Sequence, residues 1–213
     1  MIRGIIFDMD GVLVDAQDWH YDALNRALRL FGYEISRYNH LTTYNGLSTK
    51  KKLEMLSLES NLPRELHTFI NEMKQNFTME IIHAKCKPRF IHQYALATLK
   101  SMHYKLALAS NSIRPTVDIM MQKVELMQYF DGVLSASDVL HPKPDPEIYL
   151  KTMAMLELHP TECLIIEDNE NGIKSAQASF AHVMKVNSVL DVTYDNITKL
   201  IQQLDARDKE QVA

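Results

Sequence analysis

Short apolar runs alternate along most of the chain with longer segments in which apolar residues recur at helical spacing. The runs, each too short to form a helix, are Gly4–Phe7, Leu106–Ala109, Gly132–Leu134, Cys163–Ile166 and the weaker His182–Val186. Continuous apolar character, without alternating polar positions, is typical of strands buried on both faces of a parallel sheet.

The segments between these runs carry apolar residues three and four positions apart, which places those residues on one face of a helix. These segments are Ile91–Met102, Val117–Val124, Ile148–Leu156 and Ile197–Leu204. Strands that alternate with such helices predict an α/β fold, a doubly wound parallel sheet of the Rossmann-like type.

The alternation is interrupted between Asp15 and Pro88. Two stretches, Trp19–Phe31 and Leu66–Ile81, have helical spacing, and no convincing strand separates them. We therefore expect a helical domain inserted directly after the first strand. The predicted core comprises residues 1–14 and 89–213, and the predicted insert comprises residues 15–88.

Composition excludes several classes of protein. With 213 residues, of which 46% are hydrophobic and 23% charged, the chain is expected to fold into one core plus a smaller domain. The net charge of −4 gives no basic surplus that would favour nucleic acid as a partner. No apolar run approaches the roughly 20 residues of a membrane span, and no signal-peptide pattern is present. We expect a cytoplasmic monomer whose cysteines, Cys86 and Cys163, are reduced.

The first apolar run ends in two carboxylates, Asp8 and Asp10, followed by Gly11. Ligands of open α/β sheets bind beyond the carboxyl ends of the strands. One carboxylate at this place could attack phosphorus, and the other could act as general acid and base. A hard cation such as Mg²⁺ would be needed to offset the negative charge. In isolation, the same motif is equally compatible with a simple turn.

Three later strand ends carry further polar residues. They are Ser110 and Asn111, then Lys143 between two prolines, then Glu167 and Asp168. A hydroxyl and an ammonium can bind phosphate oxygens, and a second acidic pair can complete an oxygen-ligand set for magnesium. Each group has a plainer interpretation, as a helix cap, an exposed turn or a solvated acidic loop. The order of the four groups, each after its own strand, is the specific signal.

That order resembles the haloacid dehalogenase superfamily of phosphatases and phosphotransferases, over nearly the whole chain. The matching motifs are Phe7–Asp15, Ser110–Asn111, Lys143–Pro146, and Glu167–Asp168 with Gly172. The resemblance implies a phosphoaspartate mechanism in which Asp8 is the nucleophile and a metal ligand. It also implies that Asp10 is the general acid and base and offers its backbone carbonyl to the metal.

The resemblance assigns the remaining motif residues as well. Asp168 would bind Mg²⁺ and Glu167 would hold a metal-bound water. Ser110 and Lys143 would hold the phosphoryl oxygens, with Asn111 assisting. The helical insert would correspond to the mobile cap of the family, which closes over the substrate.

Within the superfamily, the chain is similar to the branch of β-phosphoglucomutase and phosphoglycolate phosphatase. His20 matches a cap position that can touch the acid Asp, and Gly46 belongs to the substrate-facing cap loop, Tyr44–Ser48. Thr49 stands where the mutase has an Arg that would bind a second phosphate. We expect the neighbouring lysines 50–52 to form a solvated helix face. We also expect surface positions for His40, His67, His83, His92 and His103.

The expected function is hydrolysis of a small phosphorylated metabolite, such as a sugar phosphate, by a magnesium-dependent phosphatase. A sugar phosphomutase using the same machinery is the first alternative, against which Thr49 argues. A receiver-like module that only accepts phosphate on Asp is the second. The large helical insert and the second acid, Asp10, argue against it.

Overall fold

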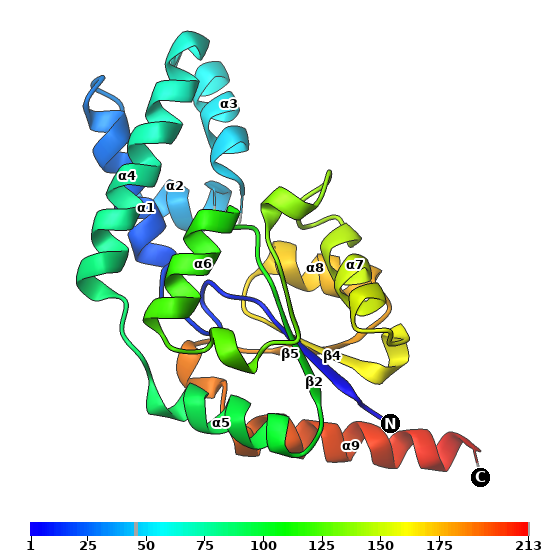
Figure 1. Cartoon of the computed structure of the whole chain (residues 1–213). Coiled ribbons are helices and arrows are strands. Elements are labelled where there is room, and N and C mark those ends of the chain that lie inside the picture. The colour runs from blue at the N-terminus through cyan, green and yellow to red at the C-terminus, as the bar shows by residue number, and fades with distance from the viewer. Residues whose placement is uncertain (45–46, 213) are drawn as a thin grey trace. The chain divides into compact units, whose positions relative to one another are not determined.

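The apolar runs form a parallel, five-stranded sheet in the computed structural model of the chain (Figure 1). The structure describes residues 1–44 and 47–212, and from residue 208 onwards only the main chain. The strands, in the spatial order β3-β2-β1-β4-β5, are β3 (Gly132–Leu134), β2 (Lys105–Ala109), β1 (Gly4–Phe7), β4 (Cys163–Glu167) and β5 (His182–Lys185). This arrangement confirms the predicted doubly wound parallel fold.

Burial follows the position of each strand in the sheet. All residues of β1 and β4 are buried, whereas β3 and β5, at the two edges, are only partly so. The weaker pattern of the last apolar run therefore reflects an edge strand. Phe7 pairs with Leu108 on one side and with Ile166 on the other, so the residue after it, Asp8, lies level with Ala109 and Glu167. The register thus aligns the carboxyl ends of the three central strands.

Helices cover both faces of this sheet. They are α5 (Phe90–Ser101), α6 (Arg114–Lys123), α7 (Glu147–Met155), α8 (Glu170–Ala178) and α9 (Tyr194–Val212). Helices α7 and α8 lie on one face, and α5 and α9 lie together on the other (Figure 1). Ile6 and Ile165 of the sheet pack with Tyr149 and Met153 of α7 in a buried cluster. None of the described helices combines the length and apolar character that a membrane span requires.

The chain divides into two compact units, Met1–Asp15 with Lys87–Ala213, which contains the sheet, and Ala16–Cys86. The described part of the second unit is helical and contains no strand. Its helices are α1 (Gln17–Arg29), α2 (Arg37–Asn39), α3 (Thr49–Glu59) and α4 (His67–Lys85). Helix α1 packs along α4, and Leu28, Leu53 and Ile70 lie in the apolar cluster that holds this unit together.

The prediction that several charged and polar residues are exposed was only partly right. Lys50 and Lys51 are exposed, but Lys52, in the first turn of α3, is buried. The prediction of surface positions was also wrong for His40 and His92, both of which are buried. The imidazole of His92 lies 2.7 Å from the carbonyl oxygen of Val189, so the main chain meets its hydrogen-bonding need inside the protein.

The central strand should carry a large share of the stability of the sheet unit. Ile6 is fully buried, so we expect Ile6→Ala to lower the free energy of unfolding by about 2–5 kcal/mol through lost contacts and a residual cavity. Chemical denaturation followed by circular dichroism measures this change. Leu140, which is 84% exposed, provides the control: Leu140→Ala should change the value by less than about 0.5 kcal/mol. Equal effects of the two substitutions would contradict the assigned core.

His40 should make the helical unit sensitive to acid. Burial, and then the charges of Lys52 and Arg37, lower the pKa of His40 from 6.5 to about 4. Between these values the unfolded chain binds the proton more readily than the folded chain. The stabilisation that comes from a neutral His40 is therefore present above pH 6.5 and is lost as the pH falls towards 4.

We expect His40→Phe to flatten the fall of stability across this acid range, because phenylalanine cannot be protonated. Trp19, the only tryptophan of the chain, lies in α1, so urea denaturation followed by its fluorescence reports on the helical unit. His83→Phe, at an exposed position of α4, is the matched control and should keep the wild-type slope. An unchanged slope in His40→Phe would show that another group controls the acid sensitivity.

Candidate active site

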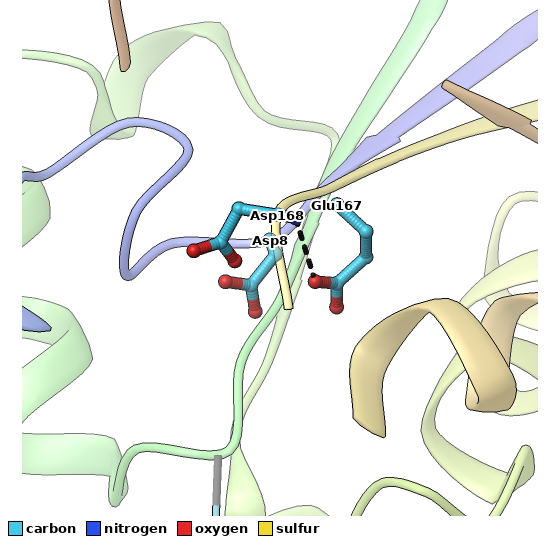
Figure 2. A group of neighbouring side chains, drawn as sticks. All are labelled: Asp8, Glu167 and Asp168. Carbon is cyan, nitrogen blue, oxygen red and sulfur yellow. Dashed lines mark hydrogen bonds between the residues drawn. The ribbon is translucent and has the colours of Figure 1, made fainter. Parts of the chain in front are cut away.

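Three carboxylates meet at the carboxyl edge of the sheet. Asp8 follows β1, Glu167 ends β4, and Asp168 follows it. Figure 2 shows the three side chains gathered at the ends of these neighbouring strands. One carboxylate oxygen from each lies within 4.8 Å of the others. The sheet register produces this proximity, because it sets the ends of β1 and β4 side by side.

The ammonium of Lys143 is buried against two of these carboxylates. It donates to Asp8 Oδ1 at 2.6 Å, to Glu167 Oε1 at 2.7 Å and to the carbonyl oxygen of Ala109 at 2.9 Å. An ammonium has three N–H donors, so these acceptors match all of its donors. Burial works to lower the pKa of Lys143, but the negative charges of Asp8 and Glu167 outweigh it and raise that pKa.

The main chain at Lys143 is held by Asn111. The side-chain amide of Asn111 donates to the carbonyl oxygen of Lys143 at 3.2 Å, and its oxygen accepts from the Lys143 N–H at 3.0 Å. The resemblance implied that Asn111 assists in holding phosphoryl oxygens. In the structure, this amide fixes the loop that carries the lysine. Ser110 is buried beside it, and its Oγ accepts from the Ser112 N–H at 3.0 Å.

Asp10 lies in a tight turn directly after the first strand. Gly11 adopts a φ of 89°, a region that favours glycine, and the N–H groups of Leu13 and Val14 both donate to the carbonyl oxygen of Met9. The chain therefore turns sharply at Gly11. The carboxylate of Asp10 accepts from Ser112 Oγ at 2.9 Å. Sequence reasoning missed Ser112, although the repeated serine in Ser-Asn-Ser offered a signal.

Glu167 is the most enclosed acid of the site, with no exposed surface. In addition to Lys143, its Oε1 accepts from the hydroxyl of Tyr149 at 2.5 Å, and its Oε2 accepts from the Asp168 N–H at 3.1 Å. A Cβ atom on Gly172 would overlap the Glu167 carboxylate, so this glycine provides the space that the acid occupies. Sequence reasoning assigned no role to Tyr149, because a tyrosine on the apolar face of α7 looks like a core residue.

The charges of the site favour a bound cation. Burial raises the pKa of Asp8 well above its ordinary value; the Glu167 carboxylate adds to this effect and the Lys143 ammonium opposes it. The Lys143 ammonium forms ion pairs with two of the three clustered carboxylates, those of Asp8 and Glu167. A set of carboxylate oxygens is the donor set that a hard divalent cation such as Mg²⁺ prefers, and a cation beside a carboxylate favours its charged form.

Two predicted site residues belong to the helical unit. His20 is partly buried in α1. Gly46 lies outside the described residues.

Known proteins of similar sequence and fold carry phosphatase and mutase names. A phosphorylated carbohydrates phosphatase of Thermotoga maritima is 28% identical over 181 residues, which are 84% of this chain and 82% of that protein. A phosphoglycolate phosphatase of Aquifex aeolicus is 26% identical over 212 residues, 96% of this chain and 97% of that protein. A crystal structure of β-phosphoglucomutase from Clostridium difficile matches the fold with a TM-score of 0.82 at 22% identity, over 97% of this chain and 100% of that chain.

A family model described as haloacid dehalogenase-like hydrolase matches residues 5–186. The match spans β1 to β5 and therefore includes every strand end of the site. It confirms the resemblance that the four motifs indicated. The chain belongs to the haloacid dehalogenase-like hydrolase family.

Proposed function

We propose that this protein is a magnesium-dependent phosphatase of small phosphorylated metabolites that acts through a phosphoaspartate on Asp8. The observation that carries the proposal is the buried group formed by Asp8, Lys143 and Glu167, with the Asp168 carboxylate beside it. The two relatives named as phosphatases, one for phosphorylated carbohydrates and one for phosphoglycolate, support this substrate class.

In the first step, a carboxylate oxygen of Asp8 attacks the phosphorus atom of the substrate. A bond forms between that oxygen and phosphorus, and the bond from phosphorus to the leaving oxygen breaks. Asp10, in its protonated form, gives its proton to the leaving oxygen, so that the product leaves as a neutral alcohol. The Ser112 hydroxyl, in contact with the Asp10 carboxylate, keeps this acid at a defined place.

In the second step, Asp10 takes a proton from a water molecule whose oxygen attacks the same phosphorus atom. The bond to Asp8 then breaks, which restores the Asp8 carboxylate and releases inorganic phosphate. Ser110 binds a phosphoryl oxygen in both steps, and the Lys143 ammonium, whose three donors are taken by Asp8, Glu167 and Ala109, offsets the charge of the phosphoryl group from its place beside Asp8. Asp8, Asp168 and the backbone carbonyl of Asp10 would hold Mg²⁺, with Glu167 behind them. When bound, the ion polarises the phosphoryl group and offsets its negative charge.

The helical unit would act as the cap that excludes water and selects the substrate. His20 and Gly46 would contribute to the substrate side of this cap, as the resemblance implies. Small metabolites fit this proposal better than phosphorylated proteins, because a cap that covers the site limits the size of what can enter.

A buried lysine in the helical unit refines the substrate class. Lys52 of α3 is 8% exposed and lies near Lys74 of α4. Burial and the charge of Lys74 lower the pKa of Lys52 to about 8. Within residues 1–44 and 47–207, no carboxylate forms a salt bridge with Lys52. The first turn of α3 contains no acidic residue either, although a helix N-terminus favours negative charge.

Lys52, at this helix N-terminus, is suited to an anion. We propose that Lys52 binds a second anionic group of the substrate, a phosphate or a carboxylate. This lysine also gives the mutase alternative a physical basis, because it could bind the second phosphate of a sugar bisphosphate although Thr49 replaces the expected arginine. Hydrolysis and isomerisation are then distinguished by whether inorganic phosphate or an isomeric sugar phosphate accumulates.

The nucleophile is tested with Asp8→Asn. We expect the magnesium-dependent release of phosphate from a panel of sugar and small-metabolite phosphates to fall more than about a thousandfold, because the amide is not a nucleophile. Asp15→Asn, an exposed acid that follows the same turn, is the matched control and should keep the wild-type rate. Mass spectrometry after an acid quench should find a phosphoryl group on the Asp8 peptide of the wild type only.

Three outcomes would contradict the proposed phosphatase. Activity that persists in Asp8→Asn would exclude Asp8 as the nucleophile. A wild type that releases no phosphate from any member of the panel would exclude simple hydrolysis. A phosphoaspartate that forms without turnover would favour the receiver-like module.

The second anionic group is tested with Lys52→Met. For a sugar bisphosphate or phosphoglycolate, we expect KM to rise about tenfold or more, because a charge-assisted hydrogen bond is lost. For a monophosphate whose remainder is neutral, KM should stay near the wild-type value. Lys51→Met, one position earlier and exposed, should leave both values unchanged. Equal KM changes for the two kinds of substrate would exclude this role of Lys52.

A further inference from the structure

The hydroxyl of Tyr149 contacts the ion pairs of the active site from behind. Tyr149 lies in the first turn of α7 and is fully buried. Its hydroxyl donates to Glu167 Oε1 at 2.5 Å, the same oxygen that accepts from Lys143 Nζ at 2.7 Å. The ammonium also lies 4.7 Å from the centroid of the tyrosine ring. One side chain therefore touches both partners of the inner ion pair.

We propose that Tyr149 is a positioning residue for phosphoryl transfer: its hydroxyl fixes the Glu167 carboxylate, and Glu167 in turn fixes the Lys143 ammonium beside Asp8. This inference rests on the proposed phosphatase function and adds a residue to its machinery. Tyr149 itself needs no contact with the substrate. Its effect reaches the nucleophile through three hydrogen bonds, from Tyr149 to Glu167, from Lys143 to Glu167 and from Lys143 to Asp8.

The argument depends on how little freedom the lysine has. All three N–H donors of its ammonium are used, by Asp8, Glu167 and the carbonyl oxygen of Ala109. If the Glu167 carboxylate rotates, the ammonium loses one acceptor and moves to restore its contacts. Asp8 Oδ1 is one of the two remaining acceptors, so the position of the lysine relative to the nucleophile changes.

The surroundings of Glu167 leave its carboxylate one well-defined position. Oε2 is held by the Asp168 N–H at 3.1 Å. Gly172 lies against the carboxylate so closely that a Cβ atom there would overlap it. The Tyr149 hydroxyl is the side-chain contact that, with Lys143, fixes Oε1. Without the hydroxyl, Glu167 Oε1 keeps only the Lys143 ammonium as a strong donor. The loss of a hydrogen bond to a buried carboxylate oxygen is destabilising, because no water replaces it in a site closed to water.

Packing alone does not require this hydroxyl. The tyrosine ring lies in the apolar cluster with Ile148 and Met153, where phenylalanine would fill the same space. The hydroxyl is the only part of the side chain that a core role leaves unexplained. Its acceptor, Glu167, is the acid that contacts Lys143.

The test is Tyr149→Phe, which removes the hydroxyl and keeps the ring beside the ammonium. We expect kcat for phosphate release to fall roughly 10- to 100-fold, as is typical when a supporting hydrogen bond behind a catalytic group is lost. KM should change less than about threefold, because only the chemical step is affected. Thr152→Val is the matched control, since Thr152 is also buried on α7 but donates to the carbonyl oxygen of Ile148, within its own helix. This control should keep the wild-type kcat.

A double-mutant cycle with Glu167→Gln tests whether tyrosine acts through the glutamate. If it does, Tyr149→Phe should have little further effect on kcat in the Glu167→Gln background. Effects that multiply would overturn the proposal, and so would a wild-type kcat in Tyr149→Phe or an equal loss in Thr152→Val. A wild type without phosphatase activity would refute the proposed function and this inference together. An active wild type with an unaltered Tyr149→Phe would refute the inference alone.

Discussion

The rest of the site depends on the ion pairs that the buried ammonium of Lys143 forms with Asp8 and Glu167. A carboxylate enclosed by protein tends to take up a proton, because the charged form loses its hydration. Asp8 and Glu167 are both buried at the edge of the sheet, and the ammonium lies between them. Asn111 fixes the main chain of the lysine and Gly172 makes room for the glutamate. These neighbours are explained by one requirement, which is to hold a positive charge beside Asp8.

The sheet could be predicted because its three central strands, β2, β1 and β4, are almost wholly buried and consist mostly of apolar residues. The ends of the strands could be found as well, since Asp8, Lys143 and Asp168 are charged residues that follow apolar runs. Parallel strands place such ends together whatever the detail of the side chains. Contacts that depend on side-chain direction were not predictable in this way. The hydrogen bond from Ser112 to Asp10 joins two loops whose paths the apolar pattern does not determine.

The errors have physical causes too. Three successive residues of a helix spread over about 200° of its circumference, so a run such as residues 50–52 on a packed helix has one member facing inwards. That member is Lys52. Histidine is equally ambiguous, because a ring nitrogen can be satisfied by a main-chain carbonyl as well as by water. His92 is satisfied by Val189, which is 97 residues away in sequence and cannot be inferred from its neighbours.

The register of the central strands also determines when, during folding, the site can form. Lys143 and Asp8 are separated by 135 positions along the chain, and contacts of such range form only after the intervening segments have been arranged. Neither β1 nor β4 alone offers a stable place for a buried charge. Opposite charges therefore enter the interior only when both flanking strands are already in place. A partly assembled sheet keeps these acids hydrated, and the buried group of Asp8, Lys143 and Glu167 exists only in the completed molecule.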